Sequence, residues 1–245
     1  MKQRLDSLLV ERGLVESRAK AQALVLAGKV YSGGRRLEKA GMQVAADLPL
    51  EVRGQDHPWV SRGGVKLAFA LDHFAFAPLG LVCLDIGAST GGFTDVLLAR
   101  GAERVHAVDV GHGQLAWKLR TDPRVVVHER LNARFLTRAH VPEPVGALTC
   151  DASFIGLRSV LPAGLALCAP GAWAVALIKP QFEAGPDRVG KGGVVRDAAV
   201  HEEVQRTIAA WWADQPGWRV LGVAESPLRG PDGNREFLIA ARRLG

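Results

Sequence analysis

Residues 84–94 read Leu84-Asp85-Ile86-Gly87-Ala88-Ser89-Thr90-Gly91-Gly92-Phe93-Thr94, and this stretch decides the fold class. The apolar run that ends at Ile86 predicts a buried strand, and a helix is expected to begin at Gly92. The glycines between them let the backbone turn tightly and approach a ligand closely. A strand, a glycine-rich turn and a helix in this order are typical of nucleotide-binding α/β sheets, whose ligands lie beyond the carboxyl ends of the strands.

The chain beyond residue 60 alternates between strand and helix patterns. We expect strands at 81–86, 105–110, 125–128, 147–151 and 173–178, and helices at 65–76, 92–100, 157–167 and 196–212. Two further strands, 219–224 and 236–241, are joined by a segment too short for a crossover helix, so they should pair antiparallel. The sequence therefore predicts an α/β domain with a mostly parallel, Rossmann-like sheet and an antiparallel last strand.

An acidic residue, Asp109, ends the second strand, where a carboxylate can accept hydrogen bonds from ribose hydroxyls. Two adenosine-bearing cofactors compete for such a site. A dinucleotide needs Gly-x-Gly-x-x-Gly for its pyrophosphate, whereas here Ser89 replaces the second glycine and Asp85 precedes the first. A carboxylate at position 85 suits the cationic methionine end of S-adenosylmethionine, and we favour that cofactor. The expected cofactor-binding residues are Asp85, Gly87, Ala88, Ser89, Thr90, Gly91, Gly92, Phe93, Asp109 and Asn132.

Ionisable residues are expected to gather at the same edge of the sheet. Asp151 and Lys179 close the fourth and fifth strands, and Glu236 begins the antiparallel last strand. Lys66 lies on the helix that precedes the first strand. Desolvation favours a neutral lysine, which can take the proton of a sugar hydroxyl. We therefore expect these four residues to carry out methyl transfer, with the acids holding the lysines in place; structural ion pairs at strand ends are the alternative.

The first sixty residues carry half of the net charge: +3 of the +6 of the whole 245-residue chain. Leucines at helical spacing predict a helix that ends near Gly13, a second helix should follow Ser17, and short strands should follow Gly28. We expect residues 1–52 to form a small α+β domain that binds a polyanion, 53–60 a linker, and 61–245 the α/β domain. The basic residues expected to contact the polyanion are Arg4, Arg12, Arg18, Lys20, Lys29, Arg35 and Arg36.

Cysteine, histidine and hydropathy patterns exclude several classes of protein. The three cysteines lack regular spacing, so we expect neither a disulfide framework nor a zinc site, and a cytoplasmic location is the default. The seven histidines show no metal-ligand spacing, and no metal is expected. Cys83 and Cys150 lie within apolar strands and are interpreted as core residues rather than nucleophiles. The most apolar stretch, 163–178, is broken by Pro170 and Gly171, so no membrane partner is expected.

Taken together, the motifs resemble a known family. The run from Arg4 to Val30 resembles the S4 RNA-binding domain, and the remainder is similar to the FtsJ-like ribose-methyltransferase fold. An S4 domain followed by this fold resembles the TlyA (haemolysin A) family of ribosomal RNA 2′-O-methyltransferases. The segments that carry the second resemblance are Ser61-Arg62-Gly63-Gly64, the 85–94 loop, Asp109-Val110-Gly111, Asp151-x-Ser153-Phe154-Ile155, Lys179-Pro180-Gln181-Phe182-Glu183, Gly192-Gly193-Val194-Val195-Arg196-Asp197 and Gly233-Asn234-x-Glu236.

The resemblance implies S-adenosylmethionine-dependent 2′-O-methylation of a cytidine ribose in 16S ribosomal RNA, 23S ribosomal RNA or both, with ribosomal RNA or ribosomal subunits as the partner. It implies a catalytic tetrad of Lys66, Asp151, Lys179 and Glu236, and cofactor contacts from the loop at 85–93 and from Asp109. One alternative is a non-catalytic S4-type RNA-binding or ribosome-assembly protein with a degenerate methyltransferase fold. A dinucleotide-dependent oxidoreductase is another.

Overall fold

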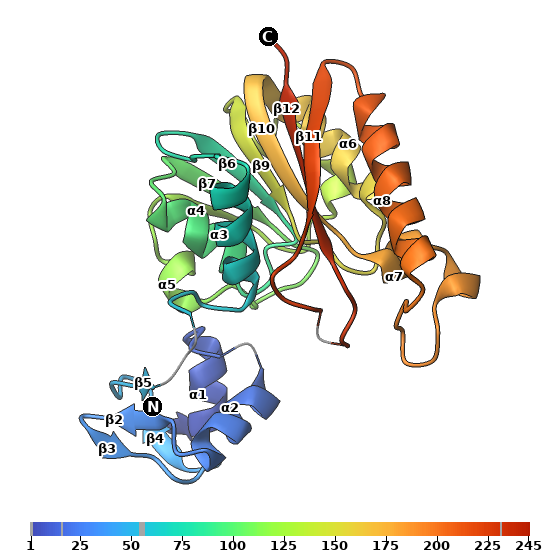
Figure 1. Ribbon diagram of the computed structural model, residues 1–245. Coiled ribbons are helices and arrows are strands. Elements are labelled where there is room, and N and C mark those ends of the chain that lie inside the picture. Colours follow the sequence, from blue (N-terminus) through green and yellow to red (C-terminus); the bar gives the residue numbers. More distant parts are fainter. Residues whose placement is uncertain (1, 16, 54–56, 231) are drawn as a thin grey trace.

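The structure is a computed structural model that describes residues 2–15, 17–53, 57–230 and 232–245. Figure 1 shows a small N-terminal domain and a larger domain built around one sheet. Among the described residues, seven strands form this sheet in the order β11-β12-β10-β9-β6-β7-β8. Their bounds are β6 (Val82–Ile86), β7 (Arg104–Val108), β8 (Val125–His128), β9 (Val145–Cys150), β10 (Cys168–Ile178), β11 (Trp218–Glu225) and β12 (Phe237–Arg243).

The pairing of these strands confirms the expected topology. β6 is parallel to both β7 and β9, and β9 is parallel to β10. β12 is antiparallel to both of its neighbours, β10 and β11, so it lies inside the sheet although it comes last in the chain. An antiparallel strand begins at the edge where parallel strands end. The start of β12 therefore meets the carboxyl ends of β9 and β10.

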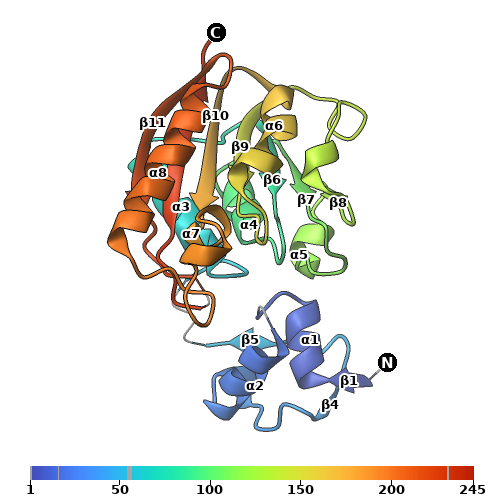
Figure 2. The same ribbon diagram turned by 90° about the vertical axis from the view of Figure 1, so that its right-hand side faces the viewer.

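Helices cover both faces of the sheet (Figures 1 and 2). Their bounds are α3 (Gly63–His73), α4 (Gly92–Ala99), α5 (Trp117–Arg120), α6 (Leu157–Leu167), α7 (Pro180–Glu183) and α8 (Ala198–Ala213), with 3-10 turns at Ala133–Phe135 and Pro186–Arg188. Successive side chains of β6 point to opposite faces. Cys83 is buried in the core that contains residues of α3 and α4, whereas Leu84 and Ile86 are buried in the core that contains residues of α6 and α8.

The expected elements of this domain are present, although several bounds differ by a few residues: β7, for example, ends at Val108, two residues before its expected end. β10 begins at Cys168 rather than at 173, and an irregularity in its pairing with β9 accommodates Pro170 and Gly171. The helices α5 and α7 were not expected, because each has only four residues and one turn carries no periodic signal. α3 begins at Gly63, two residues earlier than expected.

The N-terminal domain contains two helices and short strands: β1 (Lys2–Arg4), α1 (Leu5–Glu11), α2 (Arg18–Leu26), β2 (Val30–Ser32), β3 (Arg35–Arg36), β4 (Gln43–Ala45) and β5 (Glu51–Val52). The leucines of α1 form its core together with Val25 and Val30. Ser17 caps α2 as expected, since its hydroxyl accepts a hydrogen bond from the backbone N–H of Lys20 at 3.2 Å. β1 and β3 were not expected, because their residues are all polar.

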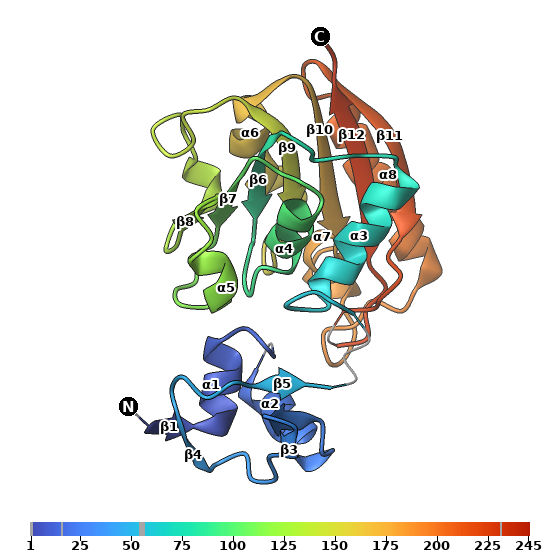
Figure 3. The same cartoon turned by 90° about the vertical axis from the view of Figure 1, so that its left-hand side faces the viewer.

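The two domains meet at the end of the sheet where the parallel strands have their carboxyl ends. Figure 3 shows the N-terminal domain at the end toward which the parallel strands point. Gly13 contacts Ala116 so closely that a Cβ on Gly13 would lie 2.1 Å from the Cβ of Ala116. The backbone N–H of Ala116 in turn donates to the carbonyl of Thr90 in the glycine-rich loop, at 3.1 Å. The N-terminal domain therefore lies beside the edge where ligands of α/β sheets bind.

Candidate active site

The loop after β6 packs tightly because it contains glycines. Gly87 has φ +78°, and a Cβ there would lie 2.7 Å from the backbone nitrogen of Ala152. Gly91 has φ +95°, and its Cβ would lie 2.3 Å from the side chain of Leu119. Substitution at either position would strain the backbone and displace a neighbour. Gly91 was expected to contact the cofactor, but it packs against Leu119 and lines neither of the cavities described next.

Two adjoining cavities open at the carboxyl edge of the sheet, with volumes of about 240 Å³ and about 700 Å³. Gly87, Ser89, Asp151 and Ser153 line both of them, so the two cavities adjoin, and together they are called the cleft. Of the other predicted cofactor residues, Ala88, Thr90, Gly92 and Phe93 line the smaller cavity, and Asp109 and Asn132 line the larger one. The structure thus gathers most of the predicted cofactor residues around one opening.

Polar groups at one end of the larger cavity are fixed by the backbone. Asp109 accepts hydrogen bonds from the N–H of Ser89 at 2.8 Å and from the N–H of Gly111 at 2.7 Å. Asn132 accepts from the N–H of Arg134 at 3.1 Å. Each carboxylate oxygen has a second lone pair, so Asp109 can still accept hydrogen bonds from a ligand's hydroxyls.

The position of Asp85 differs from the expected one, in which its carboxylate would contact the cofactor. Its side chain is fully buried and lines neither cavity, because it points toward α4. Its two oxygens accept hydrogen bonds from Thr94 at 2.7 Å and from Thr149 at 3.0 Å. Burial raises the pKa of Asp85 to about 6, against the opposing effect of the two hydroxyls. In this geometry Asp85 has no direct access to a ligand's ammonium group, and its position is that of a buried support for the loop.

Lys66 and Glu236 form a buried ion pair in the smaller cavity. The Nζ of Lys66 lies 2.5 Å from Oε2 of Glu236, and both side chains are almost completely buried. These residues are 170 positions apart in the chain and come from α3 and the segment just before β12. Gly230 crosses so near that a Cβ there would lie 2.6 Å from Oε1 of Glu236. The backbone at Gly230 therefore closes one side of the pair.

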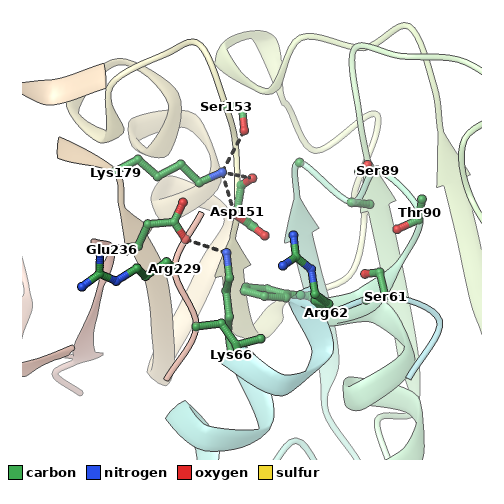
Figure 4. Close-up of a pocket in the computed structure, with 16 residues that line it drawn as sticks. Ser61, Arg62, Lys66, Ser89, Thr90, Asp151, Ser153, Lys179, Arg229 and Glu236 are labelled. Carbon is green, nitrogen blue, oxygen red and sulfur yellow. Dashed lines mark hydrogen bonds and ion pairs between the residues drawn. The ribbon is translucent and has the colours of Figure 1, made fainter. Parts of the chain in front are cut away.

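Lys179 and Asp151 form a second ion pair in the same cavity (Figure 4). The Nζ of Lys179 lies 2.7 Å from Oδ1 of Asp151. It also donates to the carbonyl of Asp151 at 3.1 Å and to the hydroxyl of Ser153 at 2.8 Å. A lysine ammonium has three donors; two of them make these hydrogen bonds, and the contact with Oδ1 of Asp151 is an ion pair without hydrogen-bond geometry. The structure thus brings together all four residues predicted to be catalytic.

Other residues of the site were not singled out from the sequence. Ser153 and Arg229 line the smaller cavity (Figure 4). Asn234 is buried; its amide accepts from the N–H of Val195 at 3.0 Å and donates to the carbonyl of Gly193 at 2.9 Å. These bonds join the 193–195 loop to the segment that carries Glu236. The motifs containing Ser153 and Asn234 were visible in the sequence, but their contacts were not.

The basic residues of the N-terminal domain have different environments. Arg12 donates to the backbone carbonyls of Ala46 and Leu48 within its own domain, which disfavours its predicted role as an RNA contact. Arg36 pairs with Glu38 at 2.7 Å, and Arg4 and Arg18 both contact Asp6. The other three predicted contacts are all exposed: Lys20, Lys29 and Arg35.

The cysteines are buried, and burial limits their chemistry. It raises the pKa of the thiols of Cys83 and Cys150 to about 12, which confirms them as core residues and disfavours a thiolate nucleophile. Within the part of the chain that the structure describes, no group of three or more His, Cys, Asp or Glu side chains is placed to hold a metal ion. None of the helices described has the length and apolar character needed to cross a bilayer.

Comparison with known proteins identifies the larger domain. A family model described as FtsJ-like methyltransferase matches residues 59–243. The chain belongs to the FtsJ-like methyltransferase family. A second model, the S4 domain, matches residues 3–48 of this FtsJ-like methyltransferase, in agreement with the expectation for the N-terminal domain.

Several relatives share both parts of this FtsJ-like methyltransferase. It is 48% identical over 240 residues to the 16S/23S rRNA (cytidine-2′-O)-methyltransferase TlyA of Mycobacterium tuberculosis, covering 98% of this chain and 89% of the relative. It is 50% identical over 239 residues to YqxC of Bacillus subtilis, covering 97% and 85%. A solved structure from Streptococcus thermophilus has a TM-score of 0.77 and 41% identity, covering 99% of this chain and 89% of that one. The FtsJ-like methyltransferase is thus a member of the TlyA family.

Proposed function

We propose that this enzyme methylates the ribose 2′-hydroxyl of a cytidine in ribosomal RNA, with S-adenosylmethionine as the methyl donor. The observation that carries the proposal is the pair of lysine–carboxylate contacts, Lys66–Glu236 and Lys179–Asp151, in one cavity beside a larger one. The ribosomal RNA substrate and the cytidine are inferred from the name of the M. tuberculosis relative, which aligns with nearly the whole chain.

The larger cavity fits the adenosine part of the proposed methyl donor. Its volume of about 700 Å³ is in the range of small-molecule sites, and Val108, Leu131 and Ile155 give it apolar walls for a purine. Asp109 offers acceptors for the ribose hydroxyls, and Asn132 offers an amide for the base. The smaller cavity, which shares Gly87 and Ser89 with it, would receive the methionine end and the target sugar.

The four ionisable side chains can prepare a sugar hydroxyl for methyl transfer. S-adenosylmethionine carries its methyl group on a positively charged sulfur, which makes that carbon electrophilic. During attack of the hydroxyl oxygen on that carbon, Nζ of Lys179 would accept the hydroxyl proton, once its ammonium had released a proton to solvent. The ammonium that forms is stabilised by Asp151 and the hydroxyl of Ser153. Lys66, held by Glu236, donates a hydrogen bond that orients the hydroxyl.

An exposed aromatic ring beside the cleft supports an RNA substrate. Phe154 follows Ser153, lines the larger cavity and is 90% exposed. Its backbone is left-handed, with φ +64°, an uncommon conformation for a bulky residue. Such strain at a site edge points to function rather than to packing. A ring in this position can stack on a base that has been turned out of its helix so that its ribose reaches the lysines.

The placement of the N-terminal domain also supports an RNA substrate. It lies at the same end of the sheet as the cleft, so one RNA could contact both (Figure 3). Because its expected contacts are lysines and arginines, RNA affinity should fall steeply as the salt concentration rises. Truncation after Pro58 should then weaken RNA binding far more than it weakens cofactor binding.

The proposal is tested by mapping ribose methylation in ribosomal RNA by mass spectrometry, in cells with and without the gene. The gene should account for at least one 2′-O-methylcytidine, and the Lys179→Ala variant should not restore it. Purified protein should also release heat on titration with S-adenosylmethionine. Unchanged methylation maps would refute the proposed activity. Absence of binding heat would instead favour the non-catalytic alternative, with a degenerate site.

A further inference from the structure

A buried carboxylate lies beneath two exposed arginines in the N-terminal domain. Asp6 is in the first turn of α1, and its side chain has no exposed surface. The guanidinium of Arg4 donates two hydrogen bonds to it, at 3.0 Å to Oδ1 and 2.9 Å to Oδ2. Arg18, from the start of α2, donates to Oδ2 at 3.2 Å, and Gln22 donates to the same oxygen at 3.0 Å. One carboxylate thus joins arginines from two elements.

This arrangement leaves both arginines able to bind a further anion. A guanidinium has five N–H donors. Arg4 directs two of them to Asp6 and Arg18 directs one, while the two side chains remain 45% and 56% exposed. The two cations are close together although they repel each other, because the carboxylate between them offsets that repulsion. The hydrogen bond from Arg4, followed by those from Gln22 and Arg18, holds the pKa of the Asp6 carboxyl well below its usual range. Asp6 therefore stays ionised throughout the physiological pH range.

We propose that Asp6 is the positioning residue of a phosphate clamp, in which Arg4 and Arg18 together bind the backbone phosphate of RNA. The inference rests on the proposed RNA-directed function. Arginine is suited to this role, since its planar fork matches the oxygens of a phosphate. The contribution of Asp6 is to fix both forks before RNA arrives. Binding then avoids the loss of side-chain freedom that two mobile arginines would undergo at the RNA surface.

Removal of the Asp6 charge should change RNA affinity in one direction if Asp6 positions the arginines, and in the opposite direction if only net charge matters. Removing a negative charge from an RNA-binding domain should tighten RNA binding if only the overall field matters. If Asp6 positions the arginines, Asp6→Asn should weaken binding instead, by about tenfold, because both arginines must then be ordered on binding. Asp47 provides a matched control: it is an exposed acid of the same domain, and no hydrogen bond or ion pair is described for its side chain. Asp47→Asn should leave affinity unchanged or slightly higher.

The experiment measures binding of the full-length protein to a fluorescein-labelled hairpin RNA of mixed sequence, over a series of salt concentrations. Asp6→Asn should lower the slope of log affinity against log salt by about 0.9 for each stem phosphate that the arginines no longer neutralise. In a background that carries Arg4→Gln and Arg18→Gln, Asp6→Asn should have no further effect on affinity. A role of Asp6 in folding alone would not produce this dependence on the two arginines. Circular dichroism and S-adenosylmethionine affinity report whether each variant is folded.

Either result for the Asp6→Asn variant bears directly on the clamp. A folded variant with unchanged or tighter RNA binding overturns the clamp. If that variant does not fold, Gln22→Ala takes its place, since Gln22 is an exposed helix residue that donates to Asp6. An affinity about threefold weaker supports the clamp in that case, and an unchanged affinity overturns it. Failure of the wild-type protein to bind any RNA would refute the proposed function itself, which distinguishes the two failures.

Discussion

Replacing Lys179 with methionine isolates the role of its ammonium group. Methionine is unbranched and apolar like the lysine stem, so Lys179→Met keeps most of the packing at the end of β10. The change removes three contacts of Nζ: the ion pair with Asp151, the bond to the Asp151 carbonyl and the bond to Ser153. Asp151 then loses its nearest cation while it still lines both cavities.

The structure sets the size of the expected effect. A positioned proton acceptor contributes about 10²–10⁴-fold to a rate, so kcat should fall by at least about 10²-fold. Stability should fall by about 1–3 kcal/mol, because a partly buried carboxylate is left without its partner. The affinity for S-adenosylmethionine should change by no more than about threefold, because the adenosine part of the cofactor is placed in the larger cavity, which Lys179 does not line, and only its methionine end is placed in the cavity that contains Lys179.

The assay is single-turnover transfer of a radiolabelled methyl group to ribosomal RNA, with cofactor affinity measured in parallel by calorimetry. The matched control is Lys118→Met, since Lys118 also pairs with an aspartate, Asp95 at 2.9 Å, but lines neither cavity. The control should keep wild-type kcat. Turnover by Lys179→Met at a rate near that of the control would refute the assignment of Lys179 as the proton acceptor.

Three further predictions concern Asp85, Arg12 and Phe154. Burial raises the pKa of Asp85 from 3.8 to about 6, so its ionisation opposes folding: stability from this group is lost as the pH rises from about 4 to 6. Relative to wild type, Asp85→Asn should therefore gain about 2.5 kcal/mol of unfolding free energy, measured by urea denaturation, between pH 4 and pH 8; equal pH dependence would contradict this. Arg12→Ala should lower the stability of the N-terminal domain by about 2 kcal/mol, measured by hydrogen exchange, because it removes the bonds to the carbonyls of Ala46 and Leu48. A lower salt slope of RNA binding with unchanged stability would show that Arg12 contacts phosphate instead. Phe154→Gly should relieve about 1 kcal/mol of backbone strain yet lower kcat/KM for RNA about tenfold or more, with cofactor affinity unchanged; wild-type kcat/KM would exclude a stacking role.

The general architecture was accessible from the sequence because it depends on periodicity. Strand patterns that alternate with helix patterns, separated by glycine-containing turns, predicted the parallel sheet. The short connection before the last strand predicted its antiparallel pairing. The convergence of Asp151, Lys179 and Glu236 followed from topology, since strand ends of one sheet share an edge, whereas Lys66, on a helix, was a candidate that the family resemblance supported. Strand pairing and the position of a residue at the end of a strand both follow from regular backbone geometry, whatever the side chain.

Features that depend on the direction of a side chain could not be predicted from the sequence. Asp85 lies in β6 two residues before Gly87, and the alternation of side chains along β6 turns its carboxyl toward Thr94 of α4 and toward Thr149, away from the cleft. Arg12 is indistinguishable in the sequence from a surface arginine, yet it binds carbonyls of residues more than thirty positions away. Hydrogen bonds of this kind join residues that are distant in the chain, and the local sequence pattern around either residue does not indicate them.

The position of β12 inside the sheet, next to the edge strand β11, has a consequence during synthesis of the protein on the ribosome. β10 and β11 have no direct pairing in the sheet, because the strand that separates them is made last. Glu236, just ahead of that strand, is also the partner of Lys66. A nascent chain that lacks β12 therefore cannot join β11 to the rest of the sheet. In such a chain Lys66 also lacks Glu236 as its partner. Closure of the sheet and formation of the Lys66–Glu236 pair therefore depend on the same late segment of the chain.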